Sequence, residues 1–256
     1  MIRVGVLGAG GRMGITVCGA VAGAPDLELV AAVDPARPGA VIEGVAVTGD
    51  ISALADAGVE VAVDFTAAAA ARENLRWCAE HGVHAVVGTT GLGADDLDEL
   101  RKLFGTGGAN AVVAPNFAIG AVLMMRLAEL AAPWFDSAEI IELHHDQKID
   151  APSGTAMLTA QRLAEASGAW GEDPTQTEVL PGARGGLGPA GIRVHSVRLR
   201  GMVAHQEVLF GTTGQSLSIR HDSYDRTSFM PGVLLAVRQV ASRPGVTVGL
   251  DALLDI

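Results

Sequence analysis

The sequence predicts an α/β protein with a parallel-sheet domain and a second α+β domain that carries an open mixed sheet. Two observations support this. In the first 117 residues, short valine-rich runs alternate with stretches of helical composition. These runs show little polar alternation, which is typical of strands buried on both faces. Beyond Phe117 a helix and a strand come first and a series of strand-like runs follows, as in an α+β domain.

The first domain is expected to be a doubly wound sheet. Its predicted strands are Arg3–Leu7, Leu27–Val33, Val59–Phe65, His84–Val87 and Ala111–Ala114. Met13–Ala22 and Asp95–Leu103 have the composition and length of helices that connect parallel strands. Ligands of such sheets bind beyond the carboxyl ends of the strands, so the loops that follow the strands are the places to look for a site.

The second domain has fewer and longer elements. Its predicted helices are Ile119–Ala132 and Thr155–Ala166, and its predicted strands are Glu139–Leu143, Arg193–Leu199, Val203–Phe210 and Ser216–Arg220. A loop rich in Gly and Pro covers Gly168–Gly191. The tail, Ser228–Ala241, is expected to be an apolar helix with Pro231 in its first turn, where proline is tolerated. Periodicity does not assign this helix to either domain.

Composition excludes several classes of protein. A net charge of −11 over 256 residues argues against a general nucleic-acid binder. Cys18 and Cys78 fall in helical stretches, which favours buried free thiols and a reducing compartment. The longest uncharged run, Gly105–Met125, is interrupted by Pro115 and two asparagines, so it is not expected to span a membrane. Because the first residues enter a strand at once, we expect no secretory signal and a cytoplasmic location.

A glycine-rich turn follows the first strand. "VGVLGAGGRMG" places four glycines at the mouth of a helix, namely Gly8, Gly10, Gly11 and Gly14. Such a turn brings the backbone close to a pyrophosphate, and the helix start offers N–H donors to it. Asp34 ends the second strand, where a ribose-binding acid is expected. The spacing fits G-x-x-G-x-x-G better than G-x-G-x-x-G. A turn without a ligand, and a plain strand-end acid, are the alternatives.

The choice between NAD and NADP stays open at this point. Asp34 favours NAD through the ribose hydroxyls. Arg12 is either a solvated charge or a partner for an adenosine 2′-phosphate, and Arg37 also leaves NADP possible.

Two further loops follow strands of the first domain. "VVGTTG" places Gly88, Thr89 and Thr90 after the fourth strand, and "VVAPNFAIG" places Ala114–Phe117 after the fifth. Each loop alone could be ordinary turn chemistry. Because both lie at corresponding strand ends, together they indicate contacts to the nicotinamide and its ribose.

The stretch "ELHHDQKIDAPSGTA" concentrates reactive side chains. His144, His145 and Lys148 precede Ser153, a good N-cap for a helix that begins near Gly154. A helix start and a lysine suit a carboxylate, and an imidazole suits proton delivery to an atom that has just received hydride electrons. The alternatives are a purely structural cluster and a metal site. The nearby acids make no familiar ligand pattern with the histidines, and we expect no metal.

Four segments in this order resemble the family of 4-hydroxy-tetrahydrodipicolinate reductases, formerly dihydrodipicolinate reductases: "GAGGRMG", "VVGTTG", "APNFAIG" and "ELHHDQKIDAPSGTA". The resemblance extends over essentially the whole chain, including "VAHQEVLFG" and "SIRHDSYDRTSFMPGVLLAV". It implies a Rossmann-like dinucleotide-binding domain of residues 1–117 and 228–256, to which the C-terminal helix and strand return. It also implies a substrate-binding and oligomerisation domain of residues 118–227, and a homotetramer.

The resemblance also implies roles for single residues. His144 is similar to the family's catalytic proton donor and acceptor, and Lys148 to a second proton donor that also attracts a carboxylate. The other substrate contacts would come from His145, Ser153, Gly154 and Thr155. NADH or NADPH would be held by Gly8, Ala9, Gly10, Gly11, Arg12, Met13, Asp34, Gly88, Thr89, Thr90, Ala114, Pro115, Asn116 and Phe117. Pro35 stands where the family often has a basic residue, so use of both cofactors is expected.

The reaction implied by the resemblance belongs to lysine and diaminopimelate biosynthesis. A small dicarboxylate loses water, hydride moves to ring carbon 4 and a proton is delivered to carbon 3. Two alternatives stay open from the residues alone. One is another dehydrogenase of an amino-acid-like acid, of the aspartate or homoserine type. The other is a non-enzymatic dinucleotide-sensing regulator. The sequence shows no basic DNA-binding segment, which argues against a regulator that binds DNA.

Overall fold

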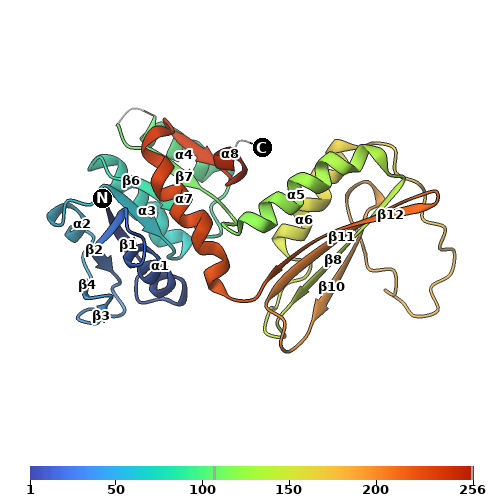
Figure 1. Ribbon diagram of the computed structural model, residues 1–256, viewed down its shortest axis with the longest axis horizontal. Coiled ribbons are helices and arrows are strands. Elements are labelled where there is room, and N and C mark those ends of the chain that lie inside the picture. Colours follow the sequence, from blue (N-terminus) through green and yellow to red (C-terminus); the bar gives the residue numbers. More distant parts are fainter. Residues whose placement is uncertain (106–107, 255) are drawn as a thin grey trace. The chain divides into compact units, whose positions relative to one another are not determined.

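The α/β prediction is confirmed by a computed structural model, which describes residues 1–105, 108–254 and 256. The chain divides into two compact units (Figure 1). One comprises Met1–Ile119 and Arg226–Ile256, and the other Gly120–Asp225. The first contains an eight-stranded sheet and the second a five-stranded sheet.

The sheet of the first unit is parallel except at one edge. Its strands are β1 (Ile2–Leu7), β2 (Leu27–Val33), β3 (Val41–Ile42), β4 (Val45–Thr48), β5 (Val61–Asp64), β6 (His84–Val87), β7 (Ala111–Val113) and β13 (Val246–Val248). Their order is β13-β7-β6-β5-β1-β2-β4-β3, and only β3 and β4 pair antiparallel. All four residues of β5 are buried, as expected for an interior strand. The carboxyl ends of β1, β2 and β5 therefore meet at one edge of the sheet.

Helices surround this sheet. They are α1 (Arg12–Ala22), α2 (Ala53–Asp56), α3 (Ala68–Glu80), α4 (Ala94–Phe104), α7 (Met230–Gln239) and α8 (Asp251–Leu254). Leu75 of α3 and Leu100 of α4 belong to one buried core with β-strand residues. The α1 helix contacts α7, which begins at Met230 with Pro231 in its first turn. The tail helix thus packs in the first unit, and β13 extends the same sheet beside β7.

The second unit is a mixed sheet with two helices on one face (Figure 1). Its strands are β8 (Ser137–His144), β9 (Gly186–Leu187), β10 (Arg193–Arg198), β11 (Ala204–Thr212) and β12 (Gln215–Ser223), in the order β12-β11-β8-β10-β9. The helices are α5 (Ile119–Ala131) and α6 (Gly154–Ala166). Only β8 and β10 pair parallel. Ala128 of α5 and Leu163 of α6 share a core with Ile140 of β8.

The structure corrects several predicted boundaries. The short hairpin of β3 and β4 was not predicted, because its two strands are short, are for the most part only half-buried and carry no periodic signal. The third strand begins at Val61, not Val59, because the N–H of Val59 donates to the carbonyl of Leu54 in a turn. Within the described ranges, no helix has both the length and the apolar character to cross a membrane.

Candidate functional site

The glycine turn after β1 is built for close approach. Gly8 has φ +76°, which disfavours other residues, and a Cβ at Gly14 would collide with the carbonyl oxygen of Gly8. The α1 helix can therefore start directly against the strand. Its N-cap is Gly11, which has no side chain to cap it. Among the described residues, none accepts from the backbone N–H of Arg12 or Met13. The turn thus presents open donors to an anion.

Replacing Gly14 by alanine should destabilise the protein by about 1–3 kcal/mol, the usual cost of overpacking. The new methyl would meet backbone atoms of Gly8 and Ala9, which cannot rotate away. Urea unfolding followed by circular dichroism measures the change. Gly19→Ala is the matched control on the same helix, because its methyl would only reach Glu43 Oε1 at 3.6 Å. Equal stabilities of the two variants would contradict this account of the turn.

Asp34 is bound to the glycine turn. Its Oδ2 accepts from the N–H of Gly10 at 2.9 Å, and its Oδ1 accepts from the N–H of Ala36 at 2.9 Å. A carboxylate has further lone pairs, so these bonds leave acceptor capacity for ribose hydroxyls. Arg37 lies beside the same turn, since a Cβ on Gly10 would meet its Cδ at 2.7 Å.

A pocket of about 500 Å³ lies in the first unit where the strands end. It is lined by Leu7, Gly8, Val33, Pro35, Gly49, Asp50, Ile51, Thr66, Ala70 and Asn74. Gly8 is the one predicted cofactor residue among them. Thr66 and Asp50 were not predicted. Thr66 follows β5, a predicted strand, so a search of the residues after each strand end would have found it. Asp50 follows β4, a strand that was not predicted, so the same search would have missed it. A pocket beside open helix donors and an acid fits a dinucleotide.

The loop after β6 is fixed by a hydrogen bond to the end of β5. The hydroxyl of Thr89 donates to Asp64 Oδ1 at 2.8 Å, and Asp64 also accepts from Thr66 and Asn74. The hydroxyl of Thr89 is therefore used to join two loops, while Thr90 is exposed. Gly88 packs against the ring of Phe65, and the Cβ atom of any other residue at this position would collide with that ring.

The loop after β7 packs against the same aromatic ring. Phe117 is buried, and its ring centroid lies 5.9 Å from that of Phe65. Asn116 Oδ1 accepts from the N–H of Ala118 at 2.9 Å, which shapes the turn. Phe65 thus contacts both loops, so the predicted segments Gly88–Thr90 and Ala114–Phe117 lie together at the carboxyl edge of the sheet.

His144 stands at the end of β8 in the second unit. Its Nδ1 lies 2.5 Å from Oε2 of Glu142, whose side chain is fully buried. Burial lowers the pKa of His144, and the neighbouring Glu142 carboxylate opposes that effect only in part. Burial alone would raise the pKa of Glu142, but hydrogen bonds from Arg198, Ser196 and His144 hold it below its usual value.

Arg198 and the start of α6 converge on the same carboxylate. Arg198 donates to both oxygens of Glu142 at 2.9 Å, and the N–H of Ser153 donates to Oε1 at 3.2 Å. The hydroxyl of Ser153 accepts from Ala156 at 3.1 Å, which confirms the predicted N-cap. In the described part of the chain, the N–H groups of Gly154 and Thr155 have no acceptor, so the helix mouth is open to an anion.

Lys148 and His145 lie on the loop between β8 and α6. The Lys148 ammonium donates to both oxygens of Asp150 at 2.7 Å, which leaves one of its three N–H groups. The backbone N–H of Lys148 donates to the carbonyl of His145, whose side chain is exposed. The predicted substrate residues are thus brought together within the second unit.

Three half-buried histidines predict how stability changes with pH. Burial lowers the pKa of His84, His144 and His221 below the ordinary value of about 6.5. As pH falls through about 6.5, the unfolded chain takes up these protons before the folded one, so the free energy of unfolding should fall. Urea unfolding at about pH 7.5 and about pH 5.5, above the carboxylate range, measures this. A protein that is more stable at about pH 5.5 than at about pH 7.5 would contradict the lowered pKa of these histidines.

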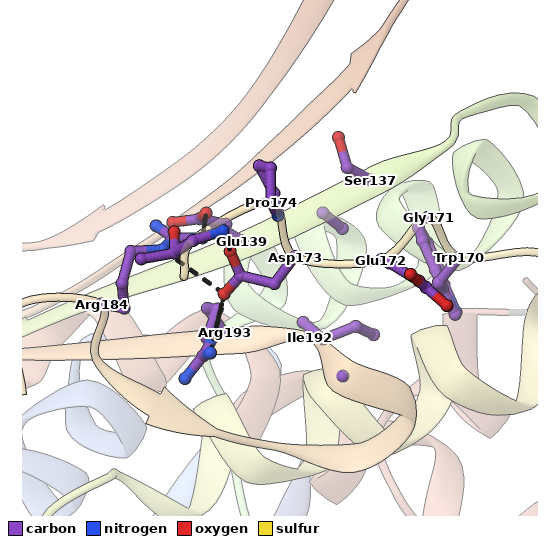
Figure 2. A pocket seen from close by; sticks show the side chains of 13 residues that line it. Ser137, Glu139, Trp170, Gly171, Glu172, Asp173, Pro174, Arg184, Ile192 and Arg193 are labelled. Atoms are coloured by element: carbon purple, nitrogen blue, oxygen red, sulfur yellow. Dashed lines mark hydrogen bonds and ion pairs between the residues drawn. The ribbon is translucent and has the colours of Figure 1, made fainter. Parts of the chain in front are cut away.

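A second hollow lies at the start of β8 (Figure 2). His144, at the last position of the same strand, does not line it. Four of its charged side chains are paired with one another: Arg193 Nη2 lies 2.7 Å from Asp173 Oδ2, and Arg184 Nη2 lies 2.7 Å from Glu139 Oε1. None of the residues predicted for the site lines this hollow.

Both units match one family over nearly their full length. Residues 2–117 match the family described as dihydrodipicolinate reductase, N-terminus, and residues 120–254 match its C-terminus. The chain belongs to the dihydrodipicolinate reductase family. The family resemblance predicted from the sequence is therefore confirmed, and with it an oxidoreductase that uses NADH or NADPH.

Relatives in the dihydrodipicolinate reductase family cover the whole chain. The 4-hydroxy-tetrahydrodipicolinate reductase of Nocardia farcinica is 56% identical over 261 residues, covering 100% of this chain and 99% of the relative. That of Mycolicibacterium vanbaalenii is 52% identical over 258 residues and covers 100% of both chains. The solved structure of dipicolinate-bound dihydrodipicolinate reductase from Paenisporosarcina sp. TG-14 is 41% identical with a TM-score of 0.89, and the match covers 98% of this chain and 99% of that one.

Proposed function

We propose that the chain reduces 4-hydroxy-tetrahydrodipicolinate to tetrahydrodipicolinate with NADH or NADPH, in lysine and diaminopimelate biosynthesis. The observation that carries this proposal is the family match across both units, together with relatives named for this substrate at 56% and 52% identity. The dipicolinate bound in the solved relative is a flat heterocycle with two carboxylates, close in chemistry to the proposed substrate.

The first unit is proposed to bind the cofactor. The open N–H groups of Arg12 and Met13 would bind the diphosphate, with the backbone of Gly8–Gly11 in contact with it. Asp34 would accept from ribose hydroxyls. The exposed Thr90 and the neighbouring loop residues Gly88, Thr89, Ala114, Pro115, Asn116 and Phe117 would hold the nicotinamide end. When bound, NADH or NADPH supplies the hydride for ring carbon 4.

The second unit is proposed to bind both carboxylates of the substrate. The N–H groups of Gly154 and Thr155 would donate to one carboxylate at the start of α6, where the helix dipole favours negative charge. Ser153 fixes that helix start. Lys148 would attract the other carboxylate with the donor that Asp150 leaves open, and the exposed His145 would touch the substrate.

His144 is proposed to move the proton. Since Nδ1 is bound to Glu142, Nε2 is the nitrogen left to exchange a proton with the substrate. Carbon 3 lies between carbon 4 and the carbon of the C=N bond, so a proton is readily lost and regained there. We assign to His144 Nε2 the delivery of a proton to carbon 3, with Lys148 as a second donor.

The family resemblance supports a proposal for the oligomeric state, and the sequence supports one for the location. Along β8, Ile140 and Glu142 are buried, while Ile141 and Leu143 on the other face of the sheet are half-exposed. That face is a candidate surface for contact between copies, and we propose a cytoplasmic homotetramer. Light scattering on the purified protein measures the mass of the assembly, and a monomer would contradict the proposal.

Loss of NADH or NADPH absorbance after addition of freshly made hydroxy-tetrahydrodipicolinate tests the proposed function. We expect turnover with both cofactors. Turnover with aspartate or homoserine but not with this substrate would favour another dehydrogenase. Cofactor binding without turnover of any of the three would favour a sensing role.

A further inference from the structure

We infer that the buried carboxylate of Glu142 is a positioning residue for the reaction, which holds the imidazole of His144 and, through Arg198, the loop of Lys148 in one arrangement. The inference rests on the proposed function, because it concerns how His144 and Lys148 are placed for that reaction. Glu142 itself is fully buried and is not assigned any contact with substrate or cofactor.

Three separate elements donate to this one carboxylate. His144 follows two residues later on β8, Arg198 ends β10, and Ser153 precedes α6. The imidazole and the helix mouth, which are proposed to meet different parts of the substrate, are therefore tied to the same two oxygen atoms. Because the carboxylate is enclosed, its position can change only if His144, Arg198 and Ser153, and with them Ser196 of β10, move as well.

The contact with Glu142 also determines which nitrogen of His144 carries the proton. An ionised carboxylate can only accept hydrogen bonds, so Nδ1 must be the donor. In the neutral imidazole the other nitrogen, Nε2, is then unprotonated and can take a proton. Glu142 stays ionised in this role because the Arg198 guanidinium binds both of its oxygens.

Arg198 extends the arrangement to the Lys148 loop. It donates to the carbonyls of Lys148 at 3.3 Å and Asp150 at 2.6 Å, and to that of Val197 at 2.9 Å, besides the two bonds to Glu142. These five bonds use all five N–H donors of a guanidinium. Arg198 therefore has no donor left for a substrate carboxylate, and its action on the site passes through Glu142 and the loop.

The same strand offers a matched control. Glu139 of β8 accepts from His195 Nε2 at 2.7 Å and from Arg184 at 2.7 Å, so it also joins a histidine to an arginine. Glu139 and Arg184 of this second cluster line the hollow drawn in Figure 2. No residue proposed to bind substrate or cofactor lines that hollow. Loss of a Glu–His–Arg contact can thus be compared at the site and outside it.

The test compares Glu142→Gln with Glu139→Gln in the steady-state assay, over a range of pH. We expect Glu142→Gln to lower kcat by about 10- to 100-fold, the scale seen when a partner that orients a histidine is removed. The limb of the pH profile that reports His144 should move to lower pH, because the charge that favours the protonated imidazole is lost. The KM for NADH should not change. Glu139→Gln, once light scattering shows that its assembly has the same mass as that of the unmodified protein, should behave as the unmodified enzyme.

Glu142→Gln removes the negative charge and would leave the Arg198 charge buried and unpaired, so this variant could fail to fold. Glu142→Asp is the second variant for that case. Aspartate keeps the charge but is one methylene too short to hold His144 and Arg198 together. We expect a folded enzyme with kcat lowered at least about tenfold. A folded variant at position 142 with unchanged kcat and an unmoved pH profile would overturn the inference. Turnover by the unmodified enzyme is the separate test of the proposed function.

Discussion

Replacing His144 by alanine should lower kcat by about two to four orders of magnitude, the usual contribution of a positioned acid–base group. The variant loses Nε2, the nitrogen proposed to exchange a proton with carbon 3. The cofactor unit is untouched, so the KM for NADH should stay close to that of the unmodified enzyme. Stopped and steady-state assays with hydroxy-tetrahydrodipicolinate measure both constants.

His195→Ala is the control for this variant. His195 lies on β10 and, like His144, is bound to a glutamate of β8, but it belongs to the cluster beside the second hollow. We expect near-normal kcat from it. If a folded His144→Ala protein also retains near-normal kcat, His144 is not the proton donor.

Replacing Lys148 by alanine should raise the KM for the substrate by about 10- to 100-fold and lower kcat as well. A hydrogen bond to a charged group contributes about 1.5–3 kcal/mol, which corresponds to this range. The substitution also removes the partner of Asp150, whose pKa is held below its usual value chiefly by the hydrogen bond from Lys148. The carboxylate of Asp150 would then stand unpaired beside the site and repel a doubly charged substrate.

The sequence provides one control for this effect, since Lys102 on α4 is the only other lysine of the chain. Lys102→Ala should leave both constants unchanged. The double variant Lys148→Ala, Asp150→Asn should recover part of the lost affinity, because the unpaired charge is gone. An unchanged KM in Lys148→Ala would exclude the carboxylate contact.

Much of the fold could be predicted because single segments carry strong local signals. The strand His84–Val87 is apolar except at its first residue, and the predicted and observed bounds agree. The start of α6 was predicted because Ser153 is a favourable N-cap, and its hydroxyl does cap the helix. Where elements are short and exposed, as in β3 and β9, no such signal exists and they were missed.

The site was only partly predictable for a different physical reason. The close spacing of His144 and Lys148 is visible in the sequence, as is the position of Asp34 after a strand. The buried contact of Glu142 with Arg198 joins residues 56 positions apart, and no local pattern reports such a pair. Likewise, Asp64 meets Thr89 only because β5 and β6 are neighbours in the sheet. Long-range ionic and polar contacts depend on register, which the structure supplies.

The central claim is that the glycine turn holds a nicotinamide cofactor for a dicarboxylate bound beside His144 and Lys148. A crystal structure of the protein with NADH and dipicolinate tests it most directly. We expect the diphosphate of the cofactor at the backbone of residues 8–13. We also expect one dipicolinate carboxylate at the N–H groups of Gly154 and Thr155 and the other at Lys148, with the ring near His144 Nε2. Dipicolinate bound away from these residues, or a cofactor absent from the glycine turn, would contradict the account.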